Sequence, residues 1–197
     1  MNEALFKLYL IRHGDTEWSE MHRHTGLSDI PLNAQGENQA RLLGKRLKGM
    51  EFVRVFASPL LRARRTCELA GFAVKAELDP DLVEWDYGDY EGRTTVDIRC
   101  HRPDWDLFRD GGPHGELPRD VAARADRFIA KVRGVEGDVV AFSSAHIIRM
   151  IAVRWLGLAP DGARYLLSST AGIGALGYEH NNNESVIHLW NDVGKIA

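Results

Sequence analysis

The sequence has few cysteines, no excess of positive charge and no long hydrophobic run. Its 197 residues include two cysteines, Cys67 and Cys100, which are too few for a disulfide framework and have no C-x-x-C spacing. This cysteine usage favours a reducing compartment, so we expect a cytoplasmic protein. The net charge of −3 argues against nucleic acid or a membrane surface as a partner, because both reward a basic excess.

Export and membrane-spanning segments are not indicated either. No stretch approaches the roughly 20 apolar residues that a spanning helix needs. Residues 1–7 mix acid and base within a short apolar stretch, unlike a signal peptide. The 44% hydrophobic and 27% charged residues are the balance of an ordinary globular protein. A chain of this length forms one sizeable core, so we predict a single domain over residues 1–197.

Residues 8–14 form an apolar run that ends in a cation, an imidazole and a glycine. The run has the length and composition of a buried strand, which places Arg12 and His13 at its carboxyl end. Ligands of open α/β sheets bind beyond such ends, and Gly14 lets the backbone turn close to a ligand. Taken alone, the same residues are equally consistent with a polar strand exit.

Apolar strands alternate with amphipathic helices along the rest of the chain. Helices are predicted at 33–48, 60–70, 118–132 and 147–156, and strands at 53–57, 74–78, 138–143, 171–178 and 185–190. This alternation predicts an α/β fold, a three-layer α/β/α sandwich with a mostly parallel central sheet and helices on both faces. Antiparallel strands are expected only at an edge.

The junction between the strand at 53–57 and the next helix is a candidate anion site. Ser58 and Pro59 are expected to begin the helix and to direct its free N–H groups into the crevice. Arg62, in the first turns, adds a full positive charge there. Arg62, Arg64 and Arg65 cannot all share one helix face, so we expect Arg62 inside and the other two outside.

The segment 82–92 is dense in acidic and aromatic residues. One of its carboxylates is a candidate catalytic acid, whereas Trp85, Tyr87 and Tyr90 either shape the substrate site or pack in the core. The histidines outside the strand ends lack metal-ligand spacing with a partner acid, so we predict no metal and no cofactor. Among them, His24 is expected to line the pocket.

Five stretches occur in a recognisable order: Leu10 to Gly14, Thr25 to Leu32, Ser58 to Thr66, Glu84 to Gly92, and Gly115-Glu116. In this order they resemble the histidine phosphatase superfamily, the phosphoglycerate-mutase-like proteins. The resemblance extends from Leu8 to about Tyr178. The fourth stretch, together with residues 171–174, is most similar to the branch of sedoheptulose bisphosphatases and small acid phosphatases.

The resemblance implies a role for each matched residue. His13 takes the phosphoryl group as nucleophile, Arg12 and Arg62 hold its oxygens, and Glu84 protonates the leaving alkoxide and then activates water. These residue types suit the chemistry, because a phosphoryl transition state needs positioned cations and an imidazole is partly unprotonated near its usual pKa of about 6.5. A phosphate dianion is also expected to raise the pKa of a facing carboxyl group. The family chemistry needs no metal.

The chain departs from the family pattern at the second histidine. Counting back from Arg149, this position is Ser144, followed by Ala145 in place of a glycine, and His146 lies two places further on. Ser144 could donate a weaker hydrogen bond to the phosphate, or His146 could turn inward as a substitute. Alternatively, the site binds phosphate esters and turns them over poorly. A purely structural role for His146 at the start of its helix is also open.

Three further residues complete the predicted phosphate site. Ser19 stands where related mutases usually have asparagine and where sugar bisphosphatases can have serine. Thr25 and Gly26 belong to the second matching stretch and are expected to contact the phosphate.

The resemblance thus implies a metal-independent phosphomonoester hydrolase that acts through a phosphohistidine on a small phosphate, with a sugar phosphate favoured. One alternative is a phosphoglycerate-type mutase, disfavoured because mutases tend to carry an added segment that shields the phosphohistidine. Another is a weakly active or non-catalytic binder of phosphate esters. The identity of the substrate, the effect of Ser144 and the formation of a homodimer remain open from the sequence.

Overall fold

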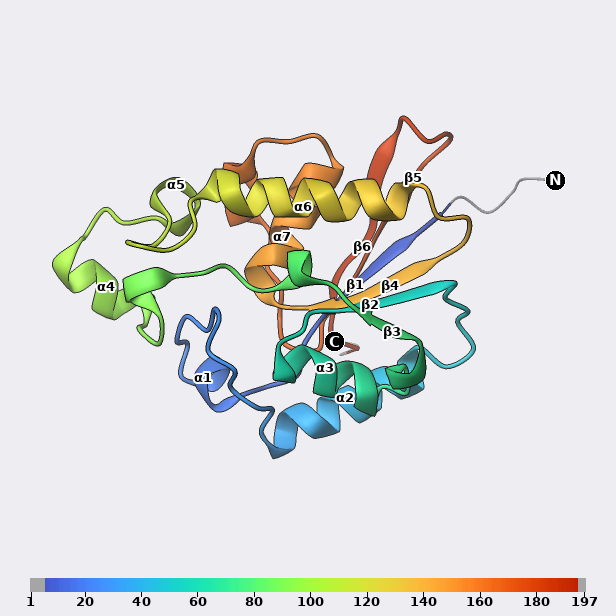
Figure 1. Cartoon of the computed structure of the whole chain (residues 1–197), viewed down its shortest axis with the longest axis horizontal. Coiled ribbons are helices and arrows are strands. Elements are labelled where there is room, and N and C mark those ends of the chain that lie inside the picture. The colour runs from blue at the N-terminus through green and yellow to red at the C-terminus, as the bar shows by residue number, and fades with distance from the viewer. Residues whose placement is uncertain (1–5, 195–197) are drawn as a thin grey trace.

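A single six-stranded sheet lies between two layers of helices in the computed structural model, which describes residues 6–194 (Figure 1). Residues 1–5 and 195–197, and with them both predicted domain ends and most of the stretch at 1–7, lie outside the described residues. The strands are β1 (Leu8–Arg12), β2 (Arg54–Ala57), β3 (Ala76–Leu78), β4 (Val139–Ser143), β5 (Ile173–Tyr178) and β6 (Ser185–Asp192).

The sheet order is β3-β2-β4-β1-β5-β6. The first four strands run parallel, and β5 is antiparallel to both β1 and β6. The predicted α/β sandwich with a mostly parallel sheet and antiparallel strands at one edge is therefore confirmed. Because β1, β2 and β4 are parallel neighbours, the residues that follow them meet at one edge of the sheet.

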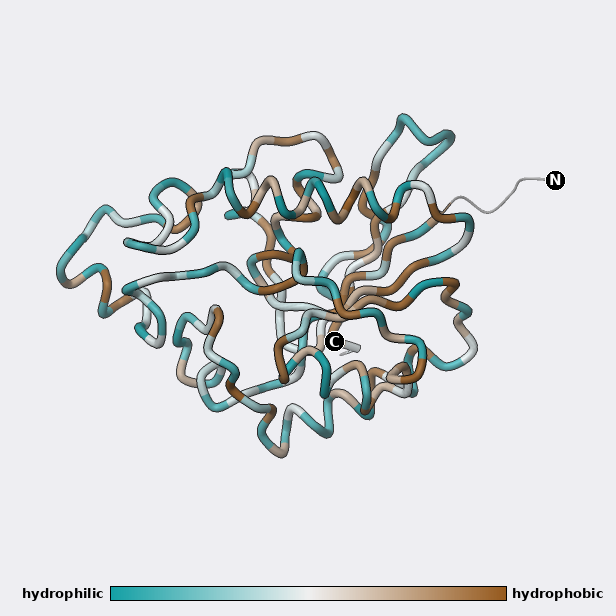
Figure 2. Tube along the Cα trace, viewed as in Figure 1, coloured by the Kyte–Doolittle hydropathy of each residue, from teal (hydrophilic) through white to brown (hydrophobic). Residues whose placement is uncertain are grey.

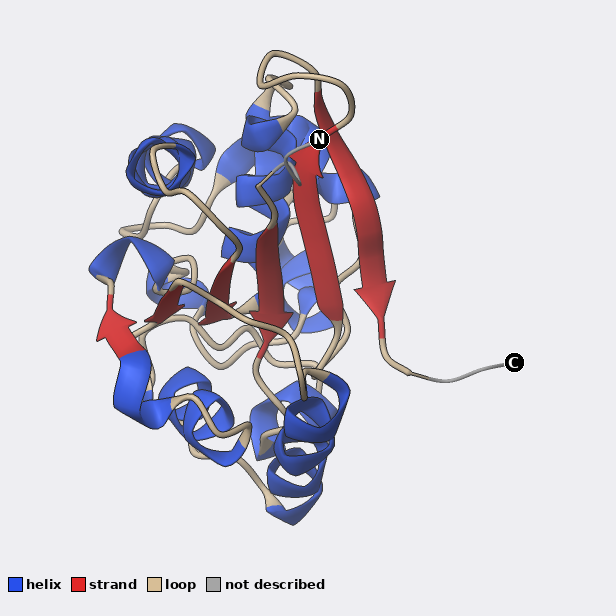
Figure 3. Ribbon diagram, turned by 90° about the vertical axis from the view of Figure 1, so that its right-hand side faces the viewer, coloured by secondary structure: helices blue, strands red, loops and turns tan. Residues whose placement is uncertain are grey.

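Helices cover both faces of the sheet (Figures 1 and 3). The pair α2 (Ala34–Arg46) and α3 (Leu61–Leu69) lies on one face, and α6 (Pro118–Arg133) and α7 (Ala145–Trp155) lie on the other. The remaining helical segments are short: α1 (Glu17–Glu20), η1 (Ala73–Lys75), η2 (Pro80–Leu82), η3 (Gly88–Tyr90), α4 (Thr95–His101), α5 (Leu107–Asp110) and η4 (Pro160–Tyr165). None of the helices within 6–194 has the length and apolar character needed to cross a bilayer.

The strands alternate their side chains between two cores. In β1, Leu8 and Leu10 join the core under α6 and α7, whereas Ile11 joins the core under α2 and α3. In β4, Val139 and Val140 separate in the same way. This period of two is the one that a pleated strand imposes, and the central strands are buried on both faces, as their hydropathy indicates (Figure 2).

Element boundaries at α3 and β3 are among those that differ from the sequence prediction. The cap of α3 is Leu60 rather than Ser58, because Asp29, from a distant loop, accepts the N–H of Leu61 at 2.6 Å and the chain stays extended up to that point. The N–H of Leu61 is therefore not free to face a ligand. The strand predicted at 74–78 is shortened to β3, because residues 73–75 form the turn η1.

Candidate active site

A cavity of about 280 Å³ opens beyond the carboxyl ends of β1 and β4. Its lining comes from six separate parts of the chain: Arg12, His13, Ser19, His22, Arg23, His24, Thr25, Glu84, Tyr87, Thr95, Ala145, His146, Arg149, Leu167 and Ser168. Most of the predicted site residues, and His24 as expected, thus lie around one space. Arg62 is fully buried next to it, and its charge acts on both His13 and Glu84.

His13 is fixed in position by hydrogen bonds to the backbone. Its N–H donates to the Ser143 carbonyl of β4 at 2.9 Å, and its ring Nδ1 lies 2.7 Å from the Gly14 carbonyl. A carbonyl can only accept, so Nδ1 carries the proton and Nε2 keeps the lone pair. This is the tautomer that a nucleophilic imidazole requires.

Gly14 is needed for packing against α2. A Cβ at this position would lie 2.3 Å from the carbonyl oxygen of Gly36, so the turn after β1 contacts α2 directly. The N–H of Gly14 donates to Thr66 Oγ1 of α3 at 3.1 Å. Both helices on this face therefore hold the turn that carries His13.

The environment of His13 favours its neutral form. Burial and the neighbouring guanidinium groups of Arg62 and Arg12 hold the pKa of His13 well below its usual value, against weaker opposition from the Gly14 carbonyl and Glu84. The imidazole thus stays unprotonated, and able to attack phosphorus, into acidic solution.

Arg12 and Arg62, the two arginines predicted to clamp the phosphoryl oxygens, are anchored by backbone carbonyl oxygens. Arg62 donates from Nη1 to the Ser28 carbonyl at 2.9 Å and from Nη2 to the carbonyls of Thr25 and Gly26 at 3.0 and 2.8 Å. Arg12 donates from Nη1 to the Ser168 carbonyl. Arg64 is exposed and Arg65 is half-buried in ion pairs with Glu37 and Glu68, so Arg62 is the buried one of the three, as expected.

Glu84 is a buried carboxylate that caps a helix. It accepts the N–H groups of Trp85, His146 and Ile147 at 3.0, 2.9 and 3.0 Å. The last two belong to the first turn of α7, which explains why this helix begins at residue 145, before the predicted start.

The pKa of Glu84 differs from the expectation. Burial raises the pKa of Glu84. The contacts with His146 and the hydrogen bonds from backbone N–H groups lower this pKa by a larger amount, so the net shift is downward. A raised pKa was expected from a facing phosphate dianion. In the chain by itself, the three backbone donors stabilise the ionised form instead.

Ser144 occupies the N-cap position of α7 without capping it. Its hydroxyl is buried and has no hydrogen-bond partner within residues 6–194. The following two residues, Ala145 and His146, both line the cavity. The ring of His146 does not point freely inward, because its Nδ1 lies 2.6 Å from the Tyr87 hydroxyl.

The remaining predicted phosphate residues have other hydrogen-bond partners. Ser19 lines the cavity, but its hydroxyl belongs to a capping box with Thr16 at the start of α1. Thr25 donates its hydroxyl to the Arg23 carbonyl. The N–H of Gly26 donates to Glu91, and its carbonyl accepts from Arg62. Gly26 therefore supports the position of Arg62 and has no N–H free for a phosphate.

Sequence reasoning missed Arg149 and Glu91. Arg149 lies over the Phe108 ring at 4.6 Å and lines the cavity. In the sequence it served only as the reference from which the position of Ser144 was counted. Glu91 accepts the N–H groups of Gly26 and Ser28. Its place in the acidic 82–92 segment was the one available signal.

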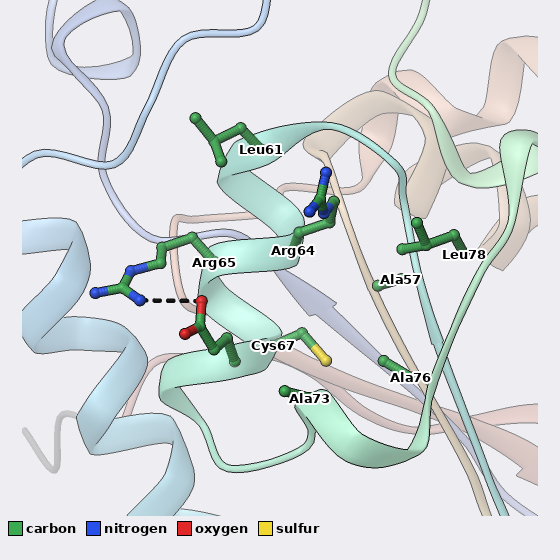
Figure 4. Close-up of a pocket in the computed structure, with 9 residues that line it drawn as sticks. Ala57, Leu61, Arg64, Arg65, Cys67, Ala73, Ala76 and Leu78 are labelled. Atoms are coloured by element: carbon green, nitrogen blue, oxygen red, sulfur yellow. Dashed lines mark ion pairs between the residues drawn. The ribbon is translucent and has the colours of Figure 1, made fainter.

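Two other features lie away from this cavity. A space of about 360 Å³ between α3 and β3 is lined by residues of α3 that include Arg64, Arg65 and the buried Cys67, and by none of the predicted site residues (Figure 4). Glu179, His180 and Glu184 bring three ligand-type atoms within 4.8 Å of one another, all exposed, at the turn between β5 and β6. Since β5 is antiparallel to β1, the turn that follows β5 lies at the amino-terminal end of β1, away from the cavity.

Comparison with known proteins decides the family. The sequence model described as "Histidine phosphatase superfamily (branch 1)" matches residues 8–193, nearly the whole chain. The chain belongs to this superfamily. The histidine phosphatase resemblance inferred from the five stretches is therefore confirmed, and with it the expectation of a phosphatase.

Named relatives and solved structures agree with this assignment. An acid phosphatase of Mycobacterium tuberculosis is 40% identical over 179 residues, which span 88% of this chain and 87% of the relative. The sedoheptulose 1,7-bisphosphatase of Saccharomyces cerevisiae is 33% identical over 181 residues, spanning 76% of this chain and 67% of the relative. A solved open-reading-frame product of M. tuberculosis superposes with a TM-score of 0.89 at 36% identity, covering 94% of this chain and 97% of its own.

Proposed function

We propose that this histidine phosphatase hydrolyses a small phosphate monoester, with a sugar phosphate as the favoured class, and that it needs no metal ion. One observation carries the assignment of the site. Among the described residues, three buried side-chain polar atoms lack a hydrogen-bond partner: Arg12 Nε, Arg62 Nε and Ser144 Oγ. All three belong to residues predicted to hold phosphate. Unpaired buried donors cost free energy, and phosphoryl oxygens are the acceptors that would satisfy them.

The proposed reaction assigns one role to each of four side chains at the cavity. His13 Nε2 attacks phosphorus, while the guanidinium groups of Arg12 and Arg62 stabilise the charge on the equatorial oxygens. Glu84 gives a proton to the leaving oxygen as the P–O bond breaks. In the second half, Glu84 takes a proton from water as the water oxygen attacks the phosphohistidine. Two fixed guanidinium groups supply the positive charge that other phosphoryl-transfer enzymes take from a metal.

The substrate class rests on the relatives and on the charge of the cavity. The acid phosphatase and the sedoheptulose 1,7-bisphosphatase support a small phosphorylated substrate. The cavity lining adds Arg23 and Arg149 to the clamp and contains one acidic residue, Glu84. Such a lining suits an anionic ester.

A weakly active phosphate-ester binder is the second candidate, and Ser144 favours it. A neutral hydroxyl replaces an imidazole at this position, which removes about 1–3 kcal/mol of stabilisation from the transition state. A phosphomutase, which moves a phosphoryl group between substrate hydroxyls, is the third candidate, because some relatives are named as probable phosphoglycerate mutases.

The test is a turnover assay with an aryl phosphate and a panel of sugar phosphates and phosphoglycerates, in the presence of a chelator. We expect release of inorganic phosphate by the wild type and its loss in His13→Ala, while His188→Ala, an exposed position on β6, serves as the matched control. Equal rates in His13→Ala would exclude His13 as nucleophile. Isomerised phosphoglycerate without free phosphate would favour a mutase, and calorimetric binding without turnover would favour the binder. Sedimentation of the same preparation tests for a homodimer.

A further inference from the structure

The structure leaves open how Glu84 acquires the proton that it gives to the leaving group. Both of its oxygens accept backbone N–H groups, from Trp85 and Ile147 on Oε1 and from His146 on Oε2. Such hydrogen bonds stabilise a carboxylate and disfavour the acid. A general acid in this setting needs a proton source beside it.

His146 is placed to be that source. Its Nδ1 lies 3.6 Å from Glu84 Oε2, and no other imidazole in residues 6–194 comes within 4 Å of this carboxylate. The ring is held among aromatic side chains, with ring centroids 5.6 Å from Phe108 and 6.5 Å from Trp85. Its distance to Glu84 is therefore set by packing.

Tyr87 competes for the same nitrogen. Its hydroxyl lies 2.6 Å from His146 Nδ1, which is its one hydrogen-bond partner among the described residues. When the neutral imidazole carries its proton on Nε2, Nδ1 accepts a hydrogen bond from the Tyr87 hydroxyl. When it is protonated, Nδ1–H can donate to Glu84. One nitrogen thus has two alternative partners, and protonation selects between them.

We propose that Tyr87 and His146 form a proton relay that loads Glu84, with His146 as a positioning residue that acts through Glu84. The proposal rests on the proposed function. Protonated His146 passes its Nδ1 proton to Glu84 Oε2, and Nδ1 then accepts a hydrogen bond from the Tyr87 hydroxyl. Glu84 gives the proton to the leaving oxygen as the P–O bond breaks and phosphorus bonds to His13. Water later attacks phosphorus as the bond from phosphorus to His13 Nε2 breaks, which releases inorganic phosphate and frees His13. The water gives a proton to Glu84, which returns it to His146, so that every proton is restored.

The charges around His146 explain why the relay responds to substrate. Burial lowers the pKa of His146, and the charges of Arg149 and Arg12 add to this effect. Glu84 opposes it by favouring the protonated ring, and the net shift is downward. Tyr87 contacts Nδ1, and the ring of His24, bound to Thr95 Oγ1, lies 6.2 Å away. Burial lowers the pKa of His24 to about 4, so this neighbour is neutral. A phosphate dianion bound between Arg12 and His13 opposes the arginine charges and favours protonated His146.

The first test uses the leaving group. An aryl phosphate expels a stable phenoxide and gains little from an acid, whereas an alkyl phosphate such as glycerol 3-phosphate depends on one. We expect His146→Gln to lower kcat/KM on the alkyl ester by about 10²-fold more than on the aryl ester. The residual alkyl activity should also lose its rise toward acidic pH. His101→Gln, an exposed position on α4, is the matched control.

The second test shifts the relay without removing it. Tyr87→Phe keeps the ring but removes the hydrogen bond that stabilises neutral His146. The pKa of His146 should then rise, and the alkyl kcat/KM profile should move to higher pH by about one unit. This conservative variant keeps the proposal testable if His146→Gln is unstable.

The results separate the relay from simpler roles. Equal losses on both esters in His146→Gln, or an unchanged pH dependence, would overturn the relay and leave His146 a structural or phosphate-binding residue. A profile that stays in place or moves to lower pH in Tyr87→Phe would overturn it as well. Activity of His13→Ala on both esters would instead overturn the proposed function.

Discussion

The two sides of the site are built in opposite ways. On the nucleophile side, Arg12 and Arg62 are cations anchored by backbone carbonyls, and His13 is held in one tautomer. On the acid side, Glu84 is an anion anchored by backbone N–H groups, and the Ser144 hydroxyl has no hydrogen-bond partner in the described part of the chain. The nucleophile side matches the family pattern, whereas the acid side departs from it at Ser144 and Ala145.

This difference places the departure from the family pattern on the acid side of the site. Backbone groups complement each fixed charge, so both sides are preorganised for a phosphoryl group. The missing imidazole affects only the acid side, where Tyr87, His146 and Glu84 now form a connected set. We therefore expect substitutions on the nucleophile side to cost the most, and substitutions at Ser144 to improve or reduce activity by smaller factors.

The largest expected effect is on the nucleophile side. Arg62→Lys should lower kcat/KM on an aryl phosphate by about 10³-fold, or about 4 kcal/mol, because an ammonium group cannot reproduce a planar fork that also holds three carbonyls. Steady-state kinetics measures the loss, with Arg64→Lys on the exposed face of the same helix as control. A loss below tenfold would remove Arg62 from the clamp.

The next effect is a gain on the acid side. Ser144→His should raise kcat by about 10-fold to 100-fold, because it restores a ring donor at a position where the hydroxyl is unpaired. Ser144→Ala should lower it by about tenfold as the paired comparison. An unchanged or lower rate in Ser144→His, with the fold intact by circular dichroism, would contradict a phosphate-facing Ser144.

A smaller effect concerns the turn that carries His13. Thr66→Val keeps the shape of the side chain but leaves the Gly14 N–H without its acceptor. We expect a loss of about 1–2 kcal/mol in the free energy of unfolding, seen as a melting temperature lower by roughly 2–8 °C. Thr170→Val, at a half-buried threonine with no side-chain hydrogen bond among the described residues, is the control. An unchanged melting temperature would mean that the turn does not depend on α3.

The smallest effect concerns the loop at residues 25–28. Glu91→Gln keeps an acceptor for the N–H groups of Gly26 and Ser28 but removes its charge. Charge-assisted hydrogen bonds are the stronger ones, so kcat/KM should fall about fivefold, or about 1 kcal/mol. A neutral result would show that Arg62 alone holds this loop.

Local patterns allowed the nucleophile side to be predicted from sequence. Arg12 and His13 follow an apolar strand, and Arg62 lies on the inward face of a helix with a clear period, so their burial and direction are set by neighbours in the chain. The α/β sandwich followed from the same alternation of strands and helices. These features depend on periodicity, which a single sequence displays.

The acid side depends on contacts that no local pattern displays. Glu84 accepts the N–H groups of two residues in the first turn of α7 that are 62 and 63 positions away in the sequence. These hydrogen bonds start α7 earlier than predicted, and they help to lower the pKa of Glu84, which was expected to be raised. Asp29 displaced the start of α3 in the same manner from a loop. The bond between Tyr87 and His146 also joins two segments whose proximity only the fold creates.

The most direct test of the account is to trap the phosphoenzyme. Rapid acid-free quenching with a labelled aryl phosphate, followed by digestion and mass spectrometry, identifies the residue that carries the phosphoryl group. We predict phosphate on His13, stable in alkali and lost in acid, and increased in amount by Glu84→Gln, which slows the attack of water. Phosphate on a carboxylate, which alkali removes, or turnover with no covalent phosphate at His13 would contradict the account.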